Sequence, residues 1–216
     1  ENEVVAINRE NTTITSVVLK SGETIGCAQL INAAGTRGPA VARLAGLDIP
    51  VEPRKRCLFV FDCRTPLPGK IPLTIDTTGI FFRPEGQYYL TGCYPDPDPL
   101  ADVTDFDVLH GEFDEIIWPA LGERVPAFEA IKVVNSWAGH YDFCMLDHNA
   151  IVGPHSDVSN FLFANGFSGH GLQQSPAIGR GLSELITYGS YRALDLSPLG
   201  YERVVENRPF LEEGVI

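Results

Sequence analysis

The residues whose types and spacing could do chemistry lie in one run, Asn165 to Ser175, which reads NGFSGHGLQQS. A short apolar segment, 160–164, precedes the run, and Leu172 to Ile186 follows it with apolar residues at roughly helical spacing. This order predicts a strand, a glycine turn and a helix. Glycines permit positive φ angles and close approach of a flat ligand, and the first N–H groups of a helix lack partners within it. The run therefore predicts a site for an electron-rich ligand edge.

Two other interpretations of this run need to be weighed. A hydrolase nucleophile elbow requires G-x-S-x-G, but residues 166–170 read GFSGH, with His170 where the last glycine belongs. The run could also be a glycine-rich turn that only joins a strand to a helix. His170 is either a group that polarises a ligand or a donor within the loop, and its position favours neither role.

Three segments resemble, in family order, the FAD-dependent oxidoreductases of the D-amino-acid oxidase and sarcosine oxidase superfamily. They are LINAAGTRGPAVARLAGLDIPVEPRKRCLFVFD (30–62), NSWAGHYDFCMLDHNAIVG (135–153) and FANGFSGHGLQQSPAIGRGLSELI (163–186). The resemblance implies noncovalently bound FAD. The residues that it places against the cofactor are Ala34, Gly35, Gly166, Phe167, Ser168, Gly169, His170, Gly171, Leu172 and Gln173.

The resemblance also implies the fold class, which is α/β (α+β), and a C-terminal part of a two-domain flavoprotein. Residues 1–50 and 150–190 would be the end of a Rossmann-like FAD domain, 51–149 an antiparallel-sheet substrate domain, and 191–216 a C-terminal tail. A Rossmann FAD domain opens with a strand, G-x-G-x-x-G and a helix, and this sequence has no such motif. We therefore expect an N-terminal FAD-binding half, in cis or as a separate chain, and an inactive chain without it.

Local patterns predict the remaining elements. Segments that alternate or run apolar between Gly and Pro predict an antiparallel sheet at 55–62, 71–76, 79–84 and 87–93. Apolar spacing predicts a helix over 107–121, which Pro119 should kink or interrupt. The pattern also predicts a single strand over 25–33 and an irregular tail beyond Leu196.

The implied reaction is hydride removal from a small amine, amino acid or N-methyl amino acid. Sarcosine oxidases carry a carboxylate-binding lysine where Gln173 stands here, and glycine oxidase-like members carry an arginine where Tyr141 stands. Arg83 is the candidate replacement anchor, because a guanidinium binds a carboxylate in two places; it could equally be a surface arginine. Tyr141 and His140 are candidates to orient the amine, although Tyr141 could be a core residue with a backbone partner.

Two further functions stay open at this stage. The first is an FAD-binding assembly or scaffold protein, of the kind that serves respiratory complex I, with weak or no catalysis. The loss of both carboxylate anchors argues against a standard sarcosine or glycine oxidase and leaves this function open. The second is a noncatalytic module that kept the fold without a nucleotide domain, and the intact NGFSGHG run argues against it.

Composition excludes several classes of partner. The formal net charge of −12 disfavours nucleic acid and anionic membranes, which are bound through Lys and Arg, and no apolar run is long enough to span a bilayer. The five cysteines form no C-x-x-C pair, which argues for reduced thiols in a soluble, cytoplasmic protein and against a metal site. We expect Cys144 to be a buried thiol without a redox role. A homo-oligomer is compatible with the sequence.

Overall fold

The computed structural model describes residues 2–214, which form two compact units. The first unit contains the described residues of Glu1–Pro53 and Tyr141–Val215, and the second is Arg54–His140. The chain passes from one unit to the other within two long strands, β5 (Val51–Cys63) and β9 (Ile131–Cys144). The roles of the units as FAD and substrate domains stay predictions.

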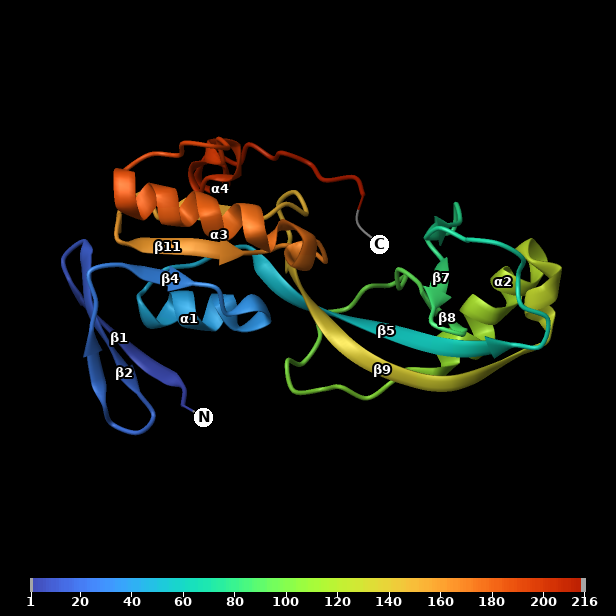
Figure 1. Ribbon diagram of the computed structural model, residues 1–216. Coiled ribbons are helices and arrows are strands. Elements are labelled where there is room, and N and C mark those ends of the chain that lie inside the picture. Colours follow the sequence, from blue (N-terminus) through green and yellow to red (C-terminus); the bar gives the residue numbers. More distant parts are fainter. Residues whose placement is uncertain (1, 215–216) are drawn as a thin grey trace. The chain divides into compact units, whose positions relative to one another are not determined.

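The central sheet of the first unit has the order β10-β11-β4. Its strands are β10 (Ile151–Pro154), β11 (Phe161–Asn165) and β4 (Leu30–Asn32). β11 is buried along its whole length, antiparallel to β10 and parallel to β4. The apolar run expected at 160–164 is thus confirmed as a strand, shifted by one residue. Figure 1 shows α3 and α1 (Gly38–Leu44) on opposite faces of this sheet.

The helix expected after the glycine turn is α3 (Gly171–Tyr188). It buries Ile178 and Leu182 against the sheet, which is the apolar stripe that its spacing predicts. Pro176 has no N–H for the carbonyl of Leu172, and the Ser175 hydroxyl donates to that carbonyl instead (2.9 Å).

A small antiparallel sheet, β1-β2-β3, contains the N-terminal strands of the first unit. The strands are β1 (Val4–Glu10), β2 (Thr13–Leu19) and β3 (Thr24–Gly26). The single strand expected over 25–33 is wrong, because β3 pairs with β2 whereas β4 joins the central sheet. The Asn160 amide causes the break: it donates to the carbonyls of Ile14 (2.8 Å) and Ala28 (3.1 Å), which turns the chain between the two strands.

The second unit is built on an antiparallel sheet, as expected, with the order β6-β7-β8-β5-β9. Its shorter strands are β6 (Thr74–Ile75), β7 (Phe81–Glu85) and β8 (Tyr88–Gly92). Phe128 lies at the centre of its core and contacts the rings of Phe61, Phe82 and Tyr89 at centroid distances of 5.1, 5.0 and 5.1 Å. Aromatic edge-to-face packing of this kind fixes the helical layer on the sheet.

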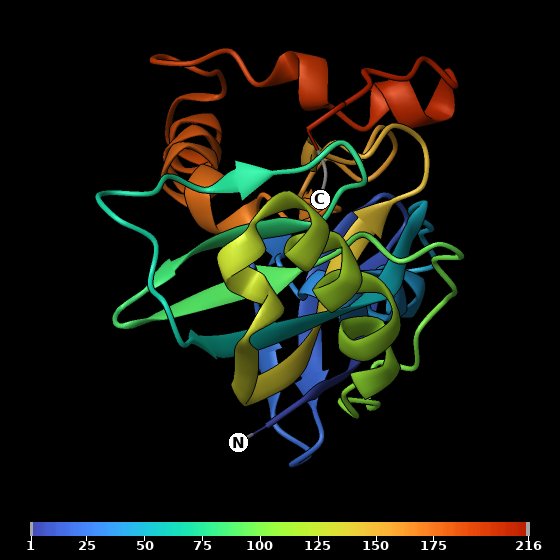
Figure 2. The same cartoon turned by 90° about the vertical axis from the view of Figure 1, so that its right-hand side faces the viewer.

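The helical layer of the second unit is irregular where the sequence predicted an interruption. A π-helical turn, η2 (Glu112–Ile117), leads into α2 (Trp118–Arg124), and the 3-10 turn η3 (Pro126–Glu129) follows. Pro119 lies in the first turn of α2, where a missing N–H is tolerated. Figure 2 shows this helical segment in front of the sheet of the second unit. None of the helices in residues 2–214 is long and apolar enough to cross a membrane.

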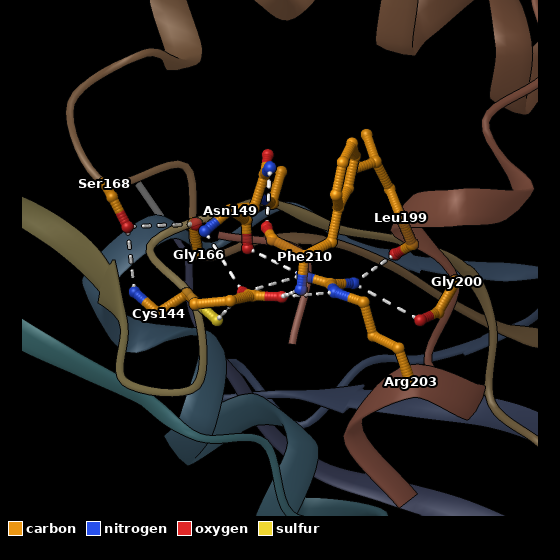
Figure 3. A network of polar contacts seen from close by, with 10 residues as sticks. Cys144, Asn149, Gly166, Ser168, Leu199, Gly200, Arg203 and Phe210 are labelled. Carbon is orange, nitrogen blue, oxygen red and sulfur yellow. Dashed lines mark hydrogen bonds and ion pairs between the residues drawn. The ribbon is translucent and has the colours of Figure 1, made fainter. Parts of the chain in front are cut away.

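The C-terminal tail is more ordered than expected. It contains η4 (Ser197–Leu199) and α4 (Glu202–Val205). Arg203, which is 1% exposed, donates from Nε to Oδ2 of the fully buried Asp147 (2.7 Å) and from Nη2 to Oδ1 (3.2 Å) (Figure 3). The Phe210 N–H donates to the same carboxylate (2.9 Å). The expected irregular tail is therefore wrong over residues 197–205, because an ion pair between residues far apart in sequence folds this part of the tail onto the first unit.

Hydrogen bonding outweighs burial at Asp147. Burial alone would raise the pKa of this carboxyl, but the Arg203 guanidinium and the Phe210 N–H stabilise the carboxylate, and its pKa lies below the ordinary value. Asp147 and His148 lie in the turn that follows β9, with Asp147 as its buried anchor.

We predict that Arg203→Met destabilises the protein by about 3–5 kcal/mol, because it leaves the Asp147 carboxylate buried without its cation. Chemical unfolding followed by circular dichroism measures the free energy of unfolding. Arg208→Met is the matched control, since the Arg208–Glu206 pair is 67% and 56% exposed, and it should change stability by no more than about 0.5 kcal/mol. Equal losses in the two variants would contradict the prediction.

Candidate functional site

The glycine loop, residues 165–170, joins β11 to α3 as predicted. Its backbone turns through positive φ at Gly166 (74°), Ser168 (48°) and Gly169 (97°). The two glycines adopt these angles without steric cost, whereas a residue with a side chain, such as Ser168, must be held in this conformation by its surroundings.

Strand β9 holds the glycine loop through hydrogen bonds. The Gly166 N–H donates to Oδ2 of Asp142 (2.7 Å), and the Ser168 N–H donates to the Asp142 carbonyl (3.1 Å). The Cys144 N–H donates to Oγ of Ser168 (3.0 Å), and this hydroxyl donates to the Gly166 carbonyl (3.3 Å) (Figure 3). Ser168 is fully buried and its hydroxyl is engaged on both sides. It is therefore a structural residue of the loop, and the hydrolase interpretation is excluded.

Asp142 lines this site although the sequence analysis gave it no role. Burial raises the pKa of its carboxyl, and the N–H groups of Gly166 and Phe167 partly offset that effect. The only sequence signal was its place three residues after the WAG motif, on the strand that returns to the glycine loop. The contact itself joins residues 24 apart, which no local pattern reports.

Tyr141 lies directly against the glycine loop. A Cβ placed on Gly169 would lie 2.5 Å from Cε2 and 3.0 Å from the hydroxyl oxygen of Tyr141. Any side chain at Gly169 would thus displace the loop or the ring. The structure brings these two predicted site residues together.

Several polar side-chain atoms at the glycine loop are buried without a hydrogen-bond partner among the described residues. They are both amide atoms of Asn165, Nδ1 of His170 and Oε1 of Gln174. Buried polar atoms are nearly always satisfied, so these mark a place where a ligand or ordered water completes the structure. His170 is the residue before the first turn of α3, where the helix N–H groups are also unpaired. The residues present therefore fit a cofactor with a polar, electron-rich edge.

The second predicted cofactor segment, Ala34 and Gly35, follows β4. Because β4 and β11 are parallel, their carboxyl ends lie at the same edge of the sheet, which is where ligands bind in open α/β sheets. Gly38, at the start of α1, packs directly on the Asn165 side chain, which connects this segment to the glycine loop. The structure thus brings together the two segments predicted to bind the cofactor.

A cavity of about 610 Å³ runs along α3 beside β4, within the first unit. Its walls are mostly apolar: Ile31, Ala33, Ala164, Phe167, Ile178, Leu182 and Ile186. Asp142 and Gly171 lie at the end near the glycine loop. β4 is the outermost strand of its sheet, and its outer edge has no neighbouring strand among the described residues.

The remaining predicted site residues belong to the second unit. Arg83 is 46% exposed and its Nη1 pairs with Oε2 of Glu85 (2.7 Å). The His140 ring packs edge-on against Phe106 at a centroid distance of 4.7 Å, and its Nε2 is buried without a partner among the described residues. The participation of Arg83 and His140 in catalysis stays a prediction.

The thiol of Cys144 is fully buried, as expected. It donates to Oδ1 of Asp147 (3.3 Å), and burial raises its pKa to about 11. All five cysteines are free, and no group of three or more His, Cys, Asp or Glu within residues 2–214 could hold a metal ion.

Comparison with known proteins gives a consistent family. Residues 1–185 match the DAO family, described as FAD dependent oxidoreductase. The chain is 42% identical over 207 residues to FAD-dependent oxidoreductase domain-containing protein 1 of Xenopus laevis, which covers 90% of this chain and 42% of that protein. It is 28% identical over 195 residues to sarcosine oxidase subunit beta of Rhizobium meliloti (strain 1021), covering 87% and 44%.

Among solved structures, L-proline dehydrogenase from P. horikoshii superposes with a TM-score of 0.80 at 24% sequence identity, covering 95% of this chain and 54% of that one. This likeness confirms the predicted α/β (α+β) fold class. The chain spans about half the length, or less, of the relatives that it matches. On the family match over residues 1–185 and the glycine loop that the structure places at the start of α3, this chain belongs to the FAD-dependent oxidoreductase family.

Proposed function

We propose that this chain is part of an oxidoreductase that oxidises a small amine, amino acid or N-methyl amino acid. The observation that carries the proposal is the glycine loop, where unpartnered polar atoms of Asn165, His170 and Gln174 surround the start of α3 in a chain of this family. Bound FAD would supply the hydride acceptance that no side chain can provide.

The residues of this chain would hold and polarise the cofactor. The N–H groups of Gly171 and Leu172 lie in the first turn of α3, where the helix dipole is positive and stabilises negative charge on a bound ring. Gly169 leaves Tyr141 in direct contact with the loop. His170 remains a candidate either for polarising the ring or for fixing the loop.

Noncovalent attachment of FAD is the mode that the cysteines support. A covalent link requires an accessible thiolate, but the Cys144 thiol is buried, is bonded to Asp147 and has a pKa of about 11. The free state of all five cysteines also supports the expected reducing, cytoplasmic compartment.

We assign the open edge of β4 to an N-terminal FAD-binding half, in cis or as a separate chain. Strands of parallel sheets are normally covered on both faces and paired along both edges. Here Ile31 on β4 is 41% exposed and Ile186 on α3 is 42% exposed, and both line the 610 Å³ cavity. A strand paired with β4 and a helix packed beside α3 would fill this apolar space, which fits the greater length of the relatives.

The substrate would be oriented by Tyr141, His140 and Arg83. Arg83 would exchange its exposed partner Glu85 for the substrate carboxylate, and that exchange costs little because both groups are nearly half in water. The alternative is an FAD-binding assembly or scaffold protein with weak or no catalysis, which the neutral residues Gln173 and Tyr141 at the usual anchor positions favour.

The experiment that tests the proposal is a visible absorption spectrum of the purified full-length protein, followed by anaerobic titration with sarcosine, dimethylglycine, proline and other small amino acids. We expect a flavin band that one of these compounds bleaches. A stable band that none of them bleaches would favour the scaffold alternative. A protein without any flavin band would contradict the cofactor assignment itself.

We predict that Gly169→Ala weakens FAD binding by about 10-fold or more, because the added Cβ collides with the Tyr141 ring and displaces the loop. Fluorescence titration of the apoprotein measures the affinity. Gly189→Ala is the matched control: Gly189 also has a positive φ (72°), but a Cβ there meets nothing within 4 Å. It should cost about 1–2 kcal/mol of stability and leave FAD affinity unchanged.

We predict that Arg83→Ala raises KM for a carboxylate-bearing amine by at least about 10-fold, with little effect on FAD content, because a charge-assisted hydrogen bond to substrate is lost. Steady-state kinetics measure this effect. Arg124→Ala is the control, since Arg124 is also an exposed arginine with an acidic partner, Asp76, in the second unit. Unchanged kinetics in Arg83→Ala would contradict the assignment of Arg83 as the anchor for the substrate carboxylate.

A further inference from the structure

We propose that Asp142 is the positioning residue of the glycine loop, with its carboxylate fixing the start of the loop so that the N–H groups of Gly169, Gly171 and Leu172 face the bound flavin. This inference rests on the proposed function and adds a residue to it. Asp142 is distinct from the glycine loop and α3, which supply the direct contacts to the cofactor.

The Asp142 carboxylate contacts the backbone at the start of the loop. It accepts the Gly166 N–H at 2.7 Å, and the Phe167 N–H also acts to lower its pKa. Gly166 has a positive φ of 74°, and successive N–H groups around such a residue form a concave turn that binds anions. Here the anion is the Asp142 carboxylate, so a side chain of the protein itself stabilises the turn at the start of the loop.

Asp142 also binds the loop through its backbone. The Asp142 carbonyl accepts the Ser168 N–H at 3.1 Å, so two loop residues, Gly166 and Ser168, are bonded to one residue of β9. The His170 N–H, two residues further on, donates to the Phe167 carbonyl, and α3 begins at the next residue. The orientation of the first turn of α3 thus depends on the contact to Asp142.

Keeping the Asp142 carboxyl in place costs free energy. Its site borders the apolar cavity beside Phe167 and Gly171, and burial disfavours its charged form. The hydrogen bonds that offset this cost come from the loop backbone. A less costly residue would serve if only packing were needed, so the charge is explained by the loop conformation that it holds.

A comparison with Asp147 separates this role from general stability. Asp147 lies five positions along the chain, is fully buried and binds Arg203 and the tail. Among its described contacts are none to residues 166–170. The two acids therefore allow a matched experiment in which one variant releases the loop and the other weakens the fold elsewhere.

The test uses full-length protein carrying Asp142→Ala, Asp142→Asn or Asp147→Asn. We expect Asp142→Ala to raise the Kd for FAD by about 10- to 100-fold, the loss of a hydrogen bond to a charged group. Asp142→Asn keeps one acceptor oxygen but loses the charge, so we expect a Kd between those of the parent and Asp142→Ala. Asp147→Asn should lower Tm and leave the Kd unchanged below its unfolding temperature. Equal Kd values in Asp142→Ala and the parent would overturn the proposal.

A second readout requires no cofactor. Hydrogen–deuterium exchange of the apoprotein should be faster at residues 166–168 in Asp142→Ala than in the parent, while Asp147→Asn leaves these amides unchanged. If exchange is faster in Asp142→Ala but the parent protein binds no FAD, Asp142 holds the loop. That result would refute both the role of Asp142 toward flavin and the proposed function. If Asp142→Ala does not fold, exchange in Asp142→Asn decides, and unchanged exchange at Gly166 and Phe167 overturns the proposal.

Discussion

The hydrogen bonds between the end of β9 and the glycine loop are the constraint on which the site depends. A loop that turns through positive φ at three of four consecutive residues does not hold one conformation unaided. At the start of the loop, the Asp142 carboxylate accepts the Gly166 N–H. Further along the loop, Oγ of Ser168 accepts the Cys144 N–H. These contacts determine where β11 ends and how α3 begins, so the unpaired N–H groups of that helix acquire a fixed direction.

The first unit stabilises the half-buried Asp142 and the fully buried Asp147 in different ways. Asp147 is compensated by a buried guanidinium, and its pKa is lowered despite burial; Asp142 is compensated by backbone N–H groups, and burial raises its pKa. The Asp147 carboxylate is paired with the buried Arg203, so its contribution to stability does not depend on the glycine loop. The Asp142 carboxylate is held by N–H groups of the loop, so its contribution to stability requires that the loop keep its turn. The charge of Asp142 and the shape of the loop are therefore coupled, whereas Asp147 acts on the tail.

Local patterns predicted what depends on local physics. Apolar runs and glycine positions predicted β11, the glycine loop and α3. The missing N–H of Pro119 predicted an interrupted helix, and the structure has a π-helical turn just before this proline. The errors lie where a single polar side chain reaches across the chain. Asn160 separates β3 from β4 by bonding to residues more than 130 positions away, and Arg203 orders the tail through Asp147, 56 positions away. Hydrophobic periodicity carries no information about such pairs.

The arrangement of β4 and β11 in the central sheet indicates that the glycine loop forms only part of a binding site. β4 and β11 end at the same edge of the sheet, which brings together the two segments predicted to bind the cofactor. Within residues 2–214, β4 has no strand on its outer edge. Exposed apolar residues line the cavity next to that edge, and buried polar atoms lack partners at its end. Unpaired backbone, uncovered apolar surface and unsatisfied polar atoms each cost free energy alone. One strand followed by a ligand-binding turn would relieve all three costs, because the strand would pair with β4 and its turn would carry the ligand to the loop.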